Sequence, residues 1–204
     1  MKPRIRRILF DFDEVLAPYR HEVRIAALAS HAGCSGERVR EVLFASGLET
    51  EFDAGAIDTA TYLGRLGDGL GRAVDAQTWI AARMAGSVAL LPMLERVAAL
   101  DAALELAVLT NNGVLMEQAI PRILGPLAAR FDGRVLCSGA LRLRKPDPAV
   151  FRLALERLEW PVQGTLFVDD SFANVKAARS IGLHAETVTG PRSLGRALRR
   201  YATR

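Results

Sequence analysis

Residues 8–13 read Ile8-Leu9-Phe10-Asp11-Phe12-Asp13, a short apolar run that leads into two aspartates. A continuous apolar run is typical of a strand covered on both faces, as in a parallel sheet. Further apolar runs along the chain also end at a polar residue. They are residues 106–109 before Thr110, 135–137 before Ser138 and 165–168 before Asp169, and residues 185–188 form a fifth candidate strand. The sequence therefore predicts a sheet of short parallel strands.

Helical patterns separate these runs. Pro92 can open a helix at its first turn, and apolar residues at helical spacing follow it. Pro148 opens another apolar stripe, and Ser171 can cap a third helix that ends near Gly182. Strands and helices in alternation predict an α/β fold, with a Rossmann-like parallel sheet and helices on both of its faces.

One stretch departs from this alternation. Between residues 18 and 86 the periodicity is helical throughout, with candidate helices at residues 22–31, 36–46, 58–66 and 76–85. We therefore expect an all-helical cap domain at residues 18–86, inserted after the first strand. Residues 1–17 and 87–204 would form the catalytic core.

The composition narrows the class of protein. The 204 residues are 50% hydrophobic and 25% charged, as in an ordinary soluble domain. A net charge of +4 suits anionic substrates but is too small to indicate nucleic acid. The first apolar run is cut by Asp11, so neither a signal peptide nor a membrane span is expected. The two cysteines lie in no CxxC pair, which argues against a disulfide framework or a zinc site and favours the reducing cytoplasm.

The polar residues at the strand ends are expected to meet, because ligands of open parallel sheets gather at the carboxyl ends of the strands. Asp11, Asp13, Asp169 and Asp170 would bring their carboxylates into one crevice. These negative charges repel each other unless a cation neutralises them, and Mg²⁺ prefers oxygen ligands from a few carboxylates together with substrate phosphate. The sequence therefore predicts a magnesium cofactor at this crevice.

A second set of residues offers groups that bind phosphate. Lys145 adds a positive charge that could meet phosphate or hold the carboxylate of Asp11. Thr110, with the amides of Asn111 and Asn112, could cradle phosphate oxygens ahead of a helix N-terminus. Each segment alone is ordinary turn or capping material. All of them in order, each after an apolar run, indicate phosphoryl transfer.

These segments resemble the motifs of the haloacid dehalogenase-like (HAD) hydrolase superfamily. The first motif is resembled by Phe10-Asp11-Phe12-Asp13-Glu14-Val15-Leu16. The later motifs are resembled by Leu109-Thr110-Asn111-Asn112, Lys145-Pro146-Asp147-Pro148 and Val168-Asp169-Asp170-Ser171. The helical insertion resembles the cap of subfamily I, the C1 cap. Within it, Phe52-Asp53-Ala54-Gly55-Ala56-Ile57-Asp58 is similar to a turn of the phosphatase branch that includes sugar phosphatases and epoxide-hydrolase N-terminal domains.

The resemblance implies a role for each matching position. Asp11 would be the nucleophile that forms an aspartyl-phosphate intermediate. Asp13 would protonate the leaving alcohol and then activate water. Magnesium would be held by Asp11, by the backbone carbonyl of Asp13 and by Asp170, with Asp169 as a further ligand through water. Phosphate would be bound by Thr110 and Asn111, and Lys145 would stabilise the charge.

The resemblance also indicates a reaction, the magnesium-dependent hydrolysis of a small phosphorylated metabolite, a sugar phosphate being one candidate. Asp13 favours phosphate esters, because a halide leaves without a proton and the family's dehalogenases generally lack an acid at this position. A phosphomutase with the same residues is the alternative, and a 2-haloacid dehalogenase or a non-catalytic phosphate-binding module is less favoured. Glu14 stands where the family often has glycine, and we interpret it as a tolerated substitution at a turn that needs no positive φ.

Overall fold

The computed structural model describes residues 5–201, so the ends of the predicted core, residues 1–4 and 202–204, lie outside the described residues. At its centre lies a parallel sheet in the strand order β3-β2-β1-β4-β5. The strands are β1 (Arg7–Phe10), β2 (Glu105–Thr110), β3 (Val135–Cys137), β4 (Thr165–Asp169) and β5 (His184–Thr187). The predicted parallel sheet is confirmed, and its strands fall on the predicted apolar runs.

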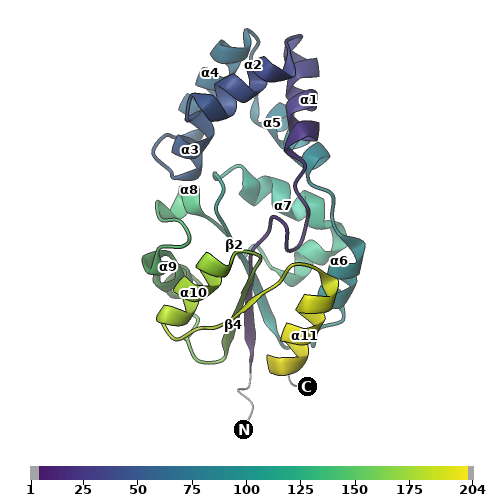
Figure 1. Cartoon of the computed structure of the whole chain (residues 1–204), viewed down its shortest axis with the longest axis vertical. Coiled ribbons are helices and arrows are strands. Elements are labelled where there is room, and N and C mark those ends of the chain that lie inside the picture. Colours follow the sequence, from purple (N-terminus) through teal and green to yellow (C-terminus); the bar gives the residue numbers. More distant parts are fainter. Residues whose placement is uncertain (1–4, 202–204) are drawn as a thin grey trace.

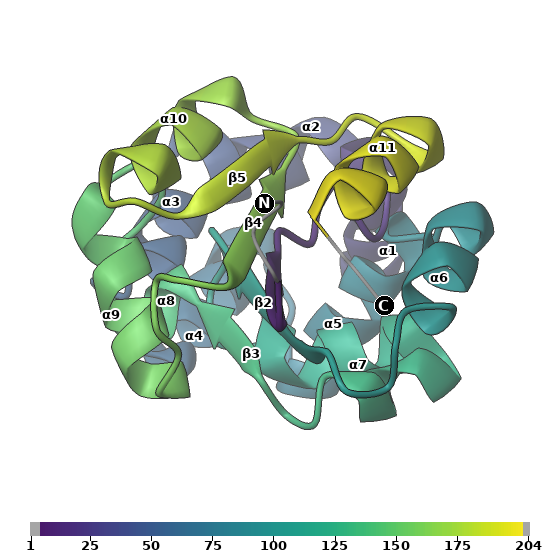
Figure 2. The same cartoon turned by 90° about the horizontal axis from the view of Figure 1, so that it is seen from below.

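Each central strand sends alternate side chains to opposite faces of the sheet, as the pleat requires. Ile8 and Phe10 of β1 pack into one apolar cluster, whereas Leu9 packs into another. Helices cover both faces (Figure 2). The first cluster is covered by α6 (Leu91–Ala98), α7 (Met116–Leu124) and α11 (Pro191–Tyr201), and the second by α9 (Pro148–Leu158) and α10 (Phe172–Ser180). The predicted Rossmann-like α/β core is therefore confirmed.

Two short segments complete the described core, the 3-10 helix η2 (Gly125–Arg130) after α7 and the helix α8 (Ser138–Leu141) after β3. No helix between residues 5 and 201 is both long enough and apolar enough to cross a membrane.

The helical stretch after β1 forms a lobe beyond the carboxyl ends of the strands (Figure 1). We call this lobe the cap. Its aromatic core holds Phe52 stacked on Tyr62, with 4.0 Å between ring centroids, and Trp79 edge-on to both. The elements of this lobe are α1 (His21–Ala32), α2 (Gly36–Arg40), the π-helix η1 (Glu41–Ala45), α3 (Leu48–Asp53), α4 (Thr59–Leu70) and α5 (Ala76–Gly86). The helix expected at residues 36–46 is thus two segments, and α3 is a helix that the periodicity did not predict.

Two chain segments connect the lobe to the core, and they pair with each other. Tyr19 and Ser87 form an antiparallel bridge. Next to it, the N–H of Arg20 donates to the carbonyl of Gly86 at 2.7 Å. We call this pair of segments the hinge, residues 17–20 and 86–90.

Glu14 lies in the turn that leads from β1 to the hinge. Its φ is 60°, in the left-handed region. The interpretation of this turn as one that needs no positive φ is therefore wrong. A non-glycine residue adopts this conformation at a cost of about 1–2 kcal/mol. The carboxylate offsets part of that cost, because its Oε1 accepts a hydrogen bond of 2.9 Å from the N–H of Tyr19.

Candidate active site

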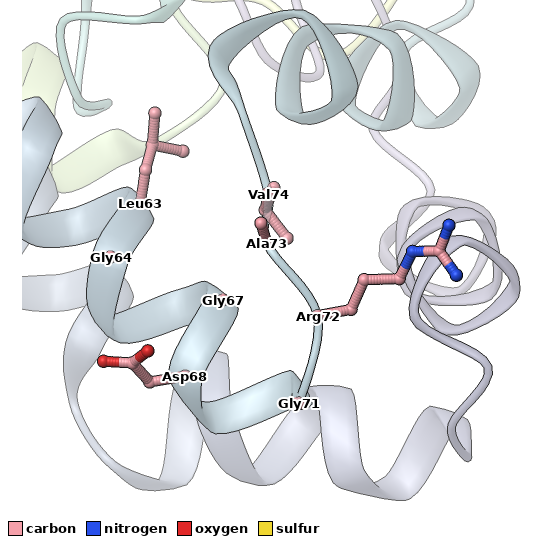
Figure 3. A pocket seen from close by; sticks show the side chains of 8 residues that line it. All are labelled: Leu63, Gly64, Gly67, Asp68, Gly71, Arg72, Ala73 and Val74. Atoms are coloured by element: carbon pink, nitrogen blue, oxygen red, sulfur yellow. The ribbon is translucent and has the colours of Figure 1, made fainter.

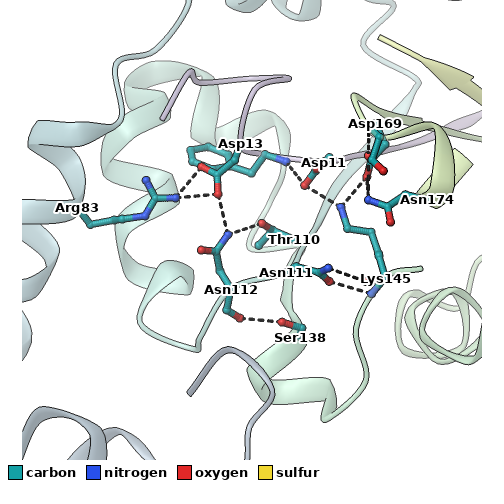
Figure 4. Close-up of polar contacts among 12 residues, drawn as sticks. Asp11, Asp13, Arg83, Thr110, Asn111, Asn112, Ser138, Lys145, Asp169 and Asn174 are labelled. Atoms are coloured by element: carbon teal, nitrogen blue, oxygen red, sulfur yellow. Dashed lines mark hydrogen bonds and ion pairs between the residues drawn. The ribbon is translucent and has the colours of Figure 1, made fainter. Parts of the chain in front are cut away.

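Side chains from the carboxyl ends of three neighbouring strands lie close together (Figure 4), on the side of the sheet that the cap covers (Figure 1). Asp11 follows β1, Thr110 ends β2 and Asp169 ends β4. β1 lies between β2 and β4, and the order of the strands along the chain reverses there, with β2 and β3 on one side of β1 and β4 and β5 on the other. Ligands of open α/β sheets bind at such a reversal of strand order. The structure therefore brings the strand-end residues together, as predicted.

Lys145 lies between Asp11 and Asp169 with 1% of its side chain exposed. Its Nζ is 2.8 Å from Oδ1 of Asp11 and 2.7 Å from Oδ2 of Asp169. Burial alone would lower the pKa of Lys145, but the two carboxylates outweigh that effect and raise it. The ammonium group therefore stays charged and holds the carboxylate of Asp11, the predicted nucleophile. This is one of the two roles that the sequence left open for Lys145, the other being a contact with phosphate.

Lys145 does not follow a strand directly, since it lies in the loop beyond α8. Asn111 holds this loop in place. Its Nδ2 donates to the carbonyl of Lys145 at 2.7 Å, and its Oδ1 accepts from the N–H of Lys145 at 2.8 Å. The side chain of Asn111 thus positions the lysine, so a contact between Asn111 and phosphate would fall to its backbone N–H.

Asp11, Asp169 and Asp170 form a group that could hold a metal ion. Each offers a carboxylate oxygen, and these oxygens lie within 4.8 Å of one another. Burial, followed by the charge of Asp169, raises the pKa of Asp170. Asp169 is fully buried and is further held by Asn174, whose Nδ2 lies 3.0 Å from its Oδ1. An all-oxygen set of negative ligands fits a hard divalent cation and supports the predicted magnesium cofactor.

The carboxylate of Asp11 is oriented by two donors. The N–H of Phe12 and the ammonium of Lys145 both approach Oδ1, at 2.7 and 2.8 Å. Within residues 5–201, Oδ2 accepts no hydrogen bond. Burial raises the pKa of Asp11 to about 8, against the lowering effect of Lys145. A bound cation would act in the same direction as Lys145 and favour the ionised nucleophile.

Asp13 is separate from the three clustered carboxylates, because its side chain turns towards the cap. Nη2 of Arg83 lies 2.6 Å from its Oδ1 and 2.8 Å from its Oδ2. Nδ2 of Asn112 donates to Oδ2 at 2.9 Å and to Oγ1 of Thr110 at 2.6 Å. A metal contact of Asp13 is thus left to its backbone carbonyl, as the resemblance implies.

Sequence reasoning missed Arg83 and Asn174. Arg83 stands in the run Trp79-Ile80-Ala81-Ala82-Arg83 of a helix whose neighbouring positions are apolar. It is four positions after Trp79, on the same stripe of α5, so its place on a buried face was visible in the spacing. The sequence did not reveal that Arg83 pairs with Asp13 of the core, because no pattern in it links α5 to Asp13. Asn174 was hidden as an ordinary residue in the first turn of α10.

The cap and the core also meet at a second point, beside Thr110. The N–H of Gly113 donates to Oδ1 of Asp53 at 2.7 Å, and Oγ of Ser138 donates to the carbonyl of Asp53 at 2.5 Å. The fit is close, because a Cβ at Gly113 would lie 2.2 Å from the ring of Phe52. Burial, followed by the charge of Glu49, raises the pKa of Asp53 to about 7. Ser138 thus fastens the cap rather than contacting the clustered carboxylates.

A separate hollow of about 470 Å³ lies on the cap, between α4 and the segment that follows it (Figure 3). Its lining is mostly glycine and small apolar side chains, with Asp68 and Arg72 at its edges. None of its lining residues belongs to the crevice at the strand ends. The groups suited to phosphate chemistry therefore lie in the core, not in this hollow.

The chain belongs to the haloacid dehalogenase-like hydrolase family, whose model matches residues 5–182. The fold is shared with a HAD family enzyme from Bacteroides thetaiotaomicron that was crystallised with magnesium and inorganic phosphate. The TM-score is 0.74 and the identity 20%, over 90% of this chain and 93% of that one. It is also shared with L-2-haloacid dehalogenase from Xanthobacter autotrophicus, with a TM-score of 0.62 and 22% identity over 95% and 82% of the two chains. The predicted superfamily is confirmed.

Two curated proteins match over shorter stretches. A drimenol cyclase from Aspergillus calidoustus is 44% identical over 55 residues, which are 27% of this chain and 10% of that protein. The mouse acyl-CoA dehydrogenase family member 10 is 37% identical over 91 residues, 43% of this chain and 8% of that protein. The chain thus aligns with about a tenth or less of each of these longer proteins.

Proposed function

We propose that the protein is a magnesium-dependent phosphatase that hydrolyses a small phosphorylated metabolite, such as a sugar phosphate, through an aspartyl-phosphate on Asp11. The observation that carries this proposal is the orientation of Asp11. Lys145 and the N–H of Phe12 hold its Oδ1, and its Oδ2 accepts no hydrogen bond from the described residues. A fixed carboxylate beside a buried cation is the arrangement that positions a nucleophile for phosphoryl transfer.

The reaction would proceed in two steps on this chain's own residues. In the first, Oδ2 of Asp11 forms a bond to phosphorus, the ester P–O bond breaks, and the leaving oxygen takes a proton from Asp13. In the second, Asp13 takes a proton from water, whose oxygen attacks phosphorus, and the bond from phosphorus to Asp11 breaks. A magnesium ion held by Asp11, Asp169 and Asp170 would supply the positive charge that lets a phosphate approach these carboxylates.

Three further observations support this reaction over the alternatives. A carboxylic acid two residues beyond the nucleophile is useful for an ester, whose alkoxide leaves poorly without a proton. The enzyme from Bacteroides thetaiotaomicron with the same fold holds magnesium and phosphate. The cap lies over the carboxyl ends of the strands, where it can exclude water and select the leaving group. We also propose that the enzyme is cytoplasmic, because Cys34 and Cys137 are both free thiols.

The proposal is tested with the purified protein, a panel of phosphorylated metabolites and 4-nitrophenyl phosphate. We expect phosphate release that requires magnesium, stops with a chelator, and is absent from Asp11→Asn. Chloride release from a 2-haloacid without phosphatase activity would point to a dehalogenase. Isomerisation of a hexose 1-phosphate without release of phosphate would point to a mutase. Binding of a phosphate mimic without turnover on any substrate would overturn the enzymatic function.

A further inference from the structure

Arg83 reaches from α5 of the cap to a side chain of the core (Figure 4). It is 1% exposed, and its Nη2 contacts both carboxylate oxygens of Asp13, at 2.6 and 2.8 Å. A partly buried, charge-assisted pair of this kind fixes the carboxylate in one orientation. We infer that Arg83 is a positioning residue for Asp13, through which the cap sets the direction in which the acid delivers its proton. This inference rests on the proposed phosphatase function.

The guanidinium is in turn held by both segments of the hinge. Its Nη1 donates to Oγ of Ser87, and its Cζ lies 3.6 Å from the ring centroid of Tyr19. Tyr19 and Ser87 are the two residues that pair across the hinge. Arg83 therefore contacts the hinge on both sides while it holds Asp13, so a change in the hinge is transmitted to the orientation of the acid.

The contacts also distinguish the two oxygens of Asp13. Oδ2 accepts from Arg83 and from Asn112, whereas Oδ1 accepts, among the described residues, from Arg83 alone. A carboxylate oxygen has two lone pairs, so Oδ1 keeps one that can carry a proton. The pair with Arg83 thus leaves one oxygen of Asp13 able to serve the leaving group and fixes where it lies.

A positioning role predicts a selective defect. Protonation of the leaving oxygen matters for an alkyl phosphate, whose alkoxide is a poor leaving group, and little for 4-nitrophenyl phosphate, whose phenolate leaves without help. The ratio kcat/KM covers the steps up to release of the alcohol, so it includes this proton transfer and excludes the later attack of water. Loss of Arg83 should therefore lower kcat/KM for the alkyl ester far more than for the aryl ester.

The test compares Arg83→Met with the wild-type enzyme on 4-nitrophenyl phosphate and on a primary alkyl phosphate that the wild type hydrolyses. We expect kcat/KM to fall about a hundredfold for the alkyl ester and less than about tenfold for the aryl ester, within the range for general acid catalysis. Arg65→Met is the matched control. Arg65 is an exposed arginine of α4 that pairs with Glu51, and its loss should change neither ratio.

Equal losses on the two esters would overturn the inference, as would an unchanged kcat/KM for the alkyl ester. If circular dichroism shows that Arg83→Met does not fold, Arg83→Lys replaces it, because an ammonium cannot hold Asp13 and Ser87 together. The same selective loss, smaller in size, is then expected, and equal losses again contradict it. A wild-type enzyme that hydrolyses no phosphate ester would overturn the proposed function, and the inference with it.

Discussion

Nζ of Lys145 lies 2.8 Å from Oδ1 of Asp11, in a place where only 1% of the lysine side chain is exposed. The same nitrogen lies 2.7 Å from Oδ2 of Asp169. One buried cation therefore joins the carboxyl ends of β1 and β4, and it comes from a loop that the sheet does not position directly. The activity and the stability of the protein should both depend on this contact.

Removal of the buried charge of Lys145 should lower both the activity and the stability of the protein. In Lys145→Met we expect kcat to fall by about a hundredfold or more, the usual effect of losing one stabilising charge at a reacting group. Without magnesium, the melting temperature should fall, because breaking a buried ion pair leaves unpaired carboxylates. Added magnesium should restore part of it. Lys176→Met, a change at an exposed lysine of α10, is the control and should alter neither quantity. Full activity in Lys145→Met would contradict the assignment.

Asp170 should contribute to metal affinity more than to the fold. In Asp170→Asn we expect the Kd for magnesium, measured by titration calorimetry, to rise about tenfold or more. The melting temperature without metal should rise slightly or stay constant, because one of the mutually repelling carboxylates is gone. The control is Asp147→Asn, because asparagine can still accept the hydrogen bond from the N–H of Ala149 at the start of α9. An unchanged Kd in Asp170→Asn would remove Asp170 from the set of ligands.

The stability of the protein should depend on pH through the burial of Asp53. Burial raises the pKa of Asp53 to about 7, so the folded state binds the proton more tightly than the unfolded state does. The stabilising contribution of protonated Asp53 to the free energy of unfolding is therefore complete below the ordinary pKa of an aspartate, about 3.9. It is lost as the pH rises from there through about 7. Asn can still accept from Gly113 but does not titrate.

Urea denaturation at several pH values between about 4 and 8 checks this dependence. We expect the free energy of unfolding of the wild type to fall, relative to Asp53→Asn, as the pH rises through this window. Parallel curves for the two proteins would show that Asp53 does not titrate between the folded and unfolded states. The comparison with Asn removes the contribution of the other carboxylates, which titrate in both proteins.

Two small substitutions at Glu14 should change the stability by different amounts. Glu14→Gly removes the strain of φ 60° together with the hydrogen bond to Tyr19, so the two effects nearly cancel. We expect a change in stability within about 0.5 kcal/mol. Glu14→Ala keeps the strain and loses the bond, so it should destabilise by about 1 kcal/mol. Equal stabilities of the two variants in urea denaturation would contradict this account of the turn.

The sequence predicted the sheet and most of the site because each relevant residue follows an apolar strand or belongs to a recognisable motif. Asp11, Thr110 and Asp169 were predictable in this way, since parallel strands carry their ends to one edge. The partner of Asp13 was not predictable, because Arg83 belongs to a cap helix whose placement over the core depends on the hinge. The left-handed backbone of Glu14 was not predictable either, because glycine is the usual signal for this conformation and is absent here. The hydrogen bond from Tyr19 to the Glu14 carboxylate offsets part of the strain instead.

The central claim is that Asp11 becomes phosphorylated and that Asp13 serves both steps. It is tested most directly with Asp13→Asn and 4-nitrophenyl phosphate in the presence of magnesium. This leaving group needs no acid, so the first step should proceed, while the second lacks its base. We expect one phosphoryl group to accumulate on the peptide that contains Asp11, detected by mass spectrometry after an acid quench, and none in a variant that also carries Asp11→Asn. Release of 4-nitrophenol with no phosphate on that peptide, or with phosphate on a different residue, would contradict the account.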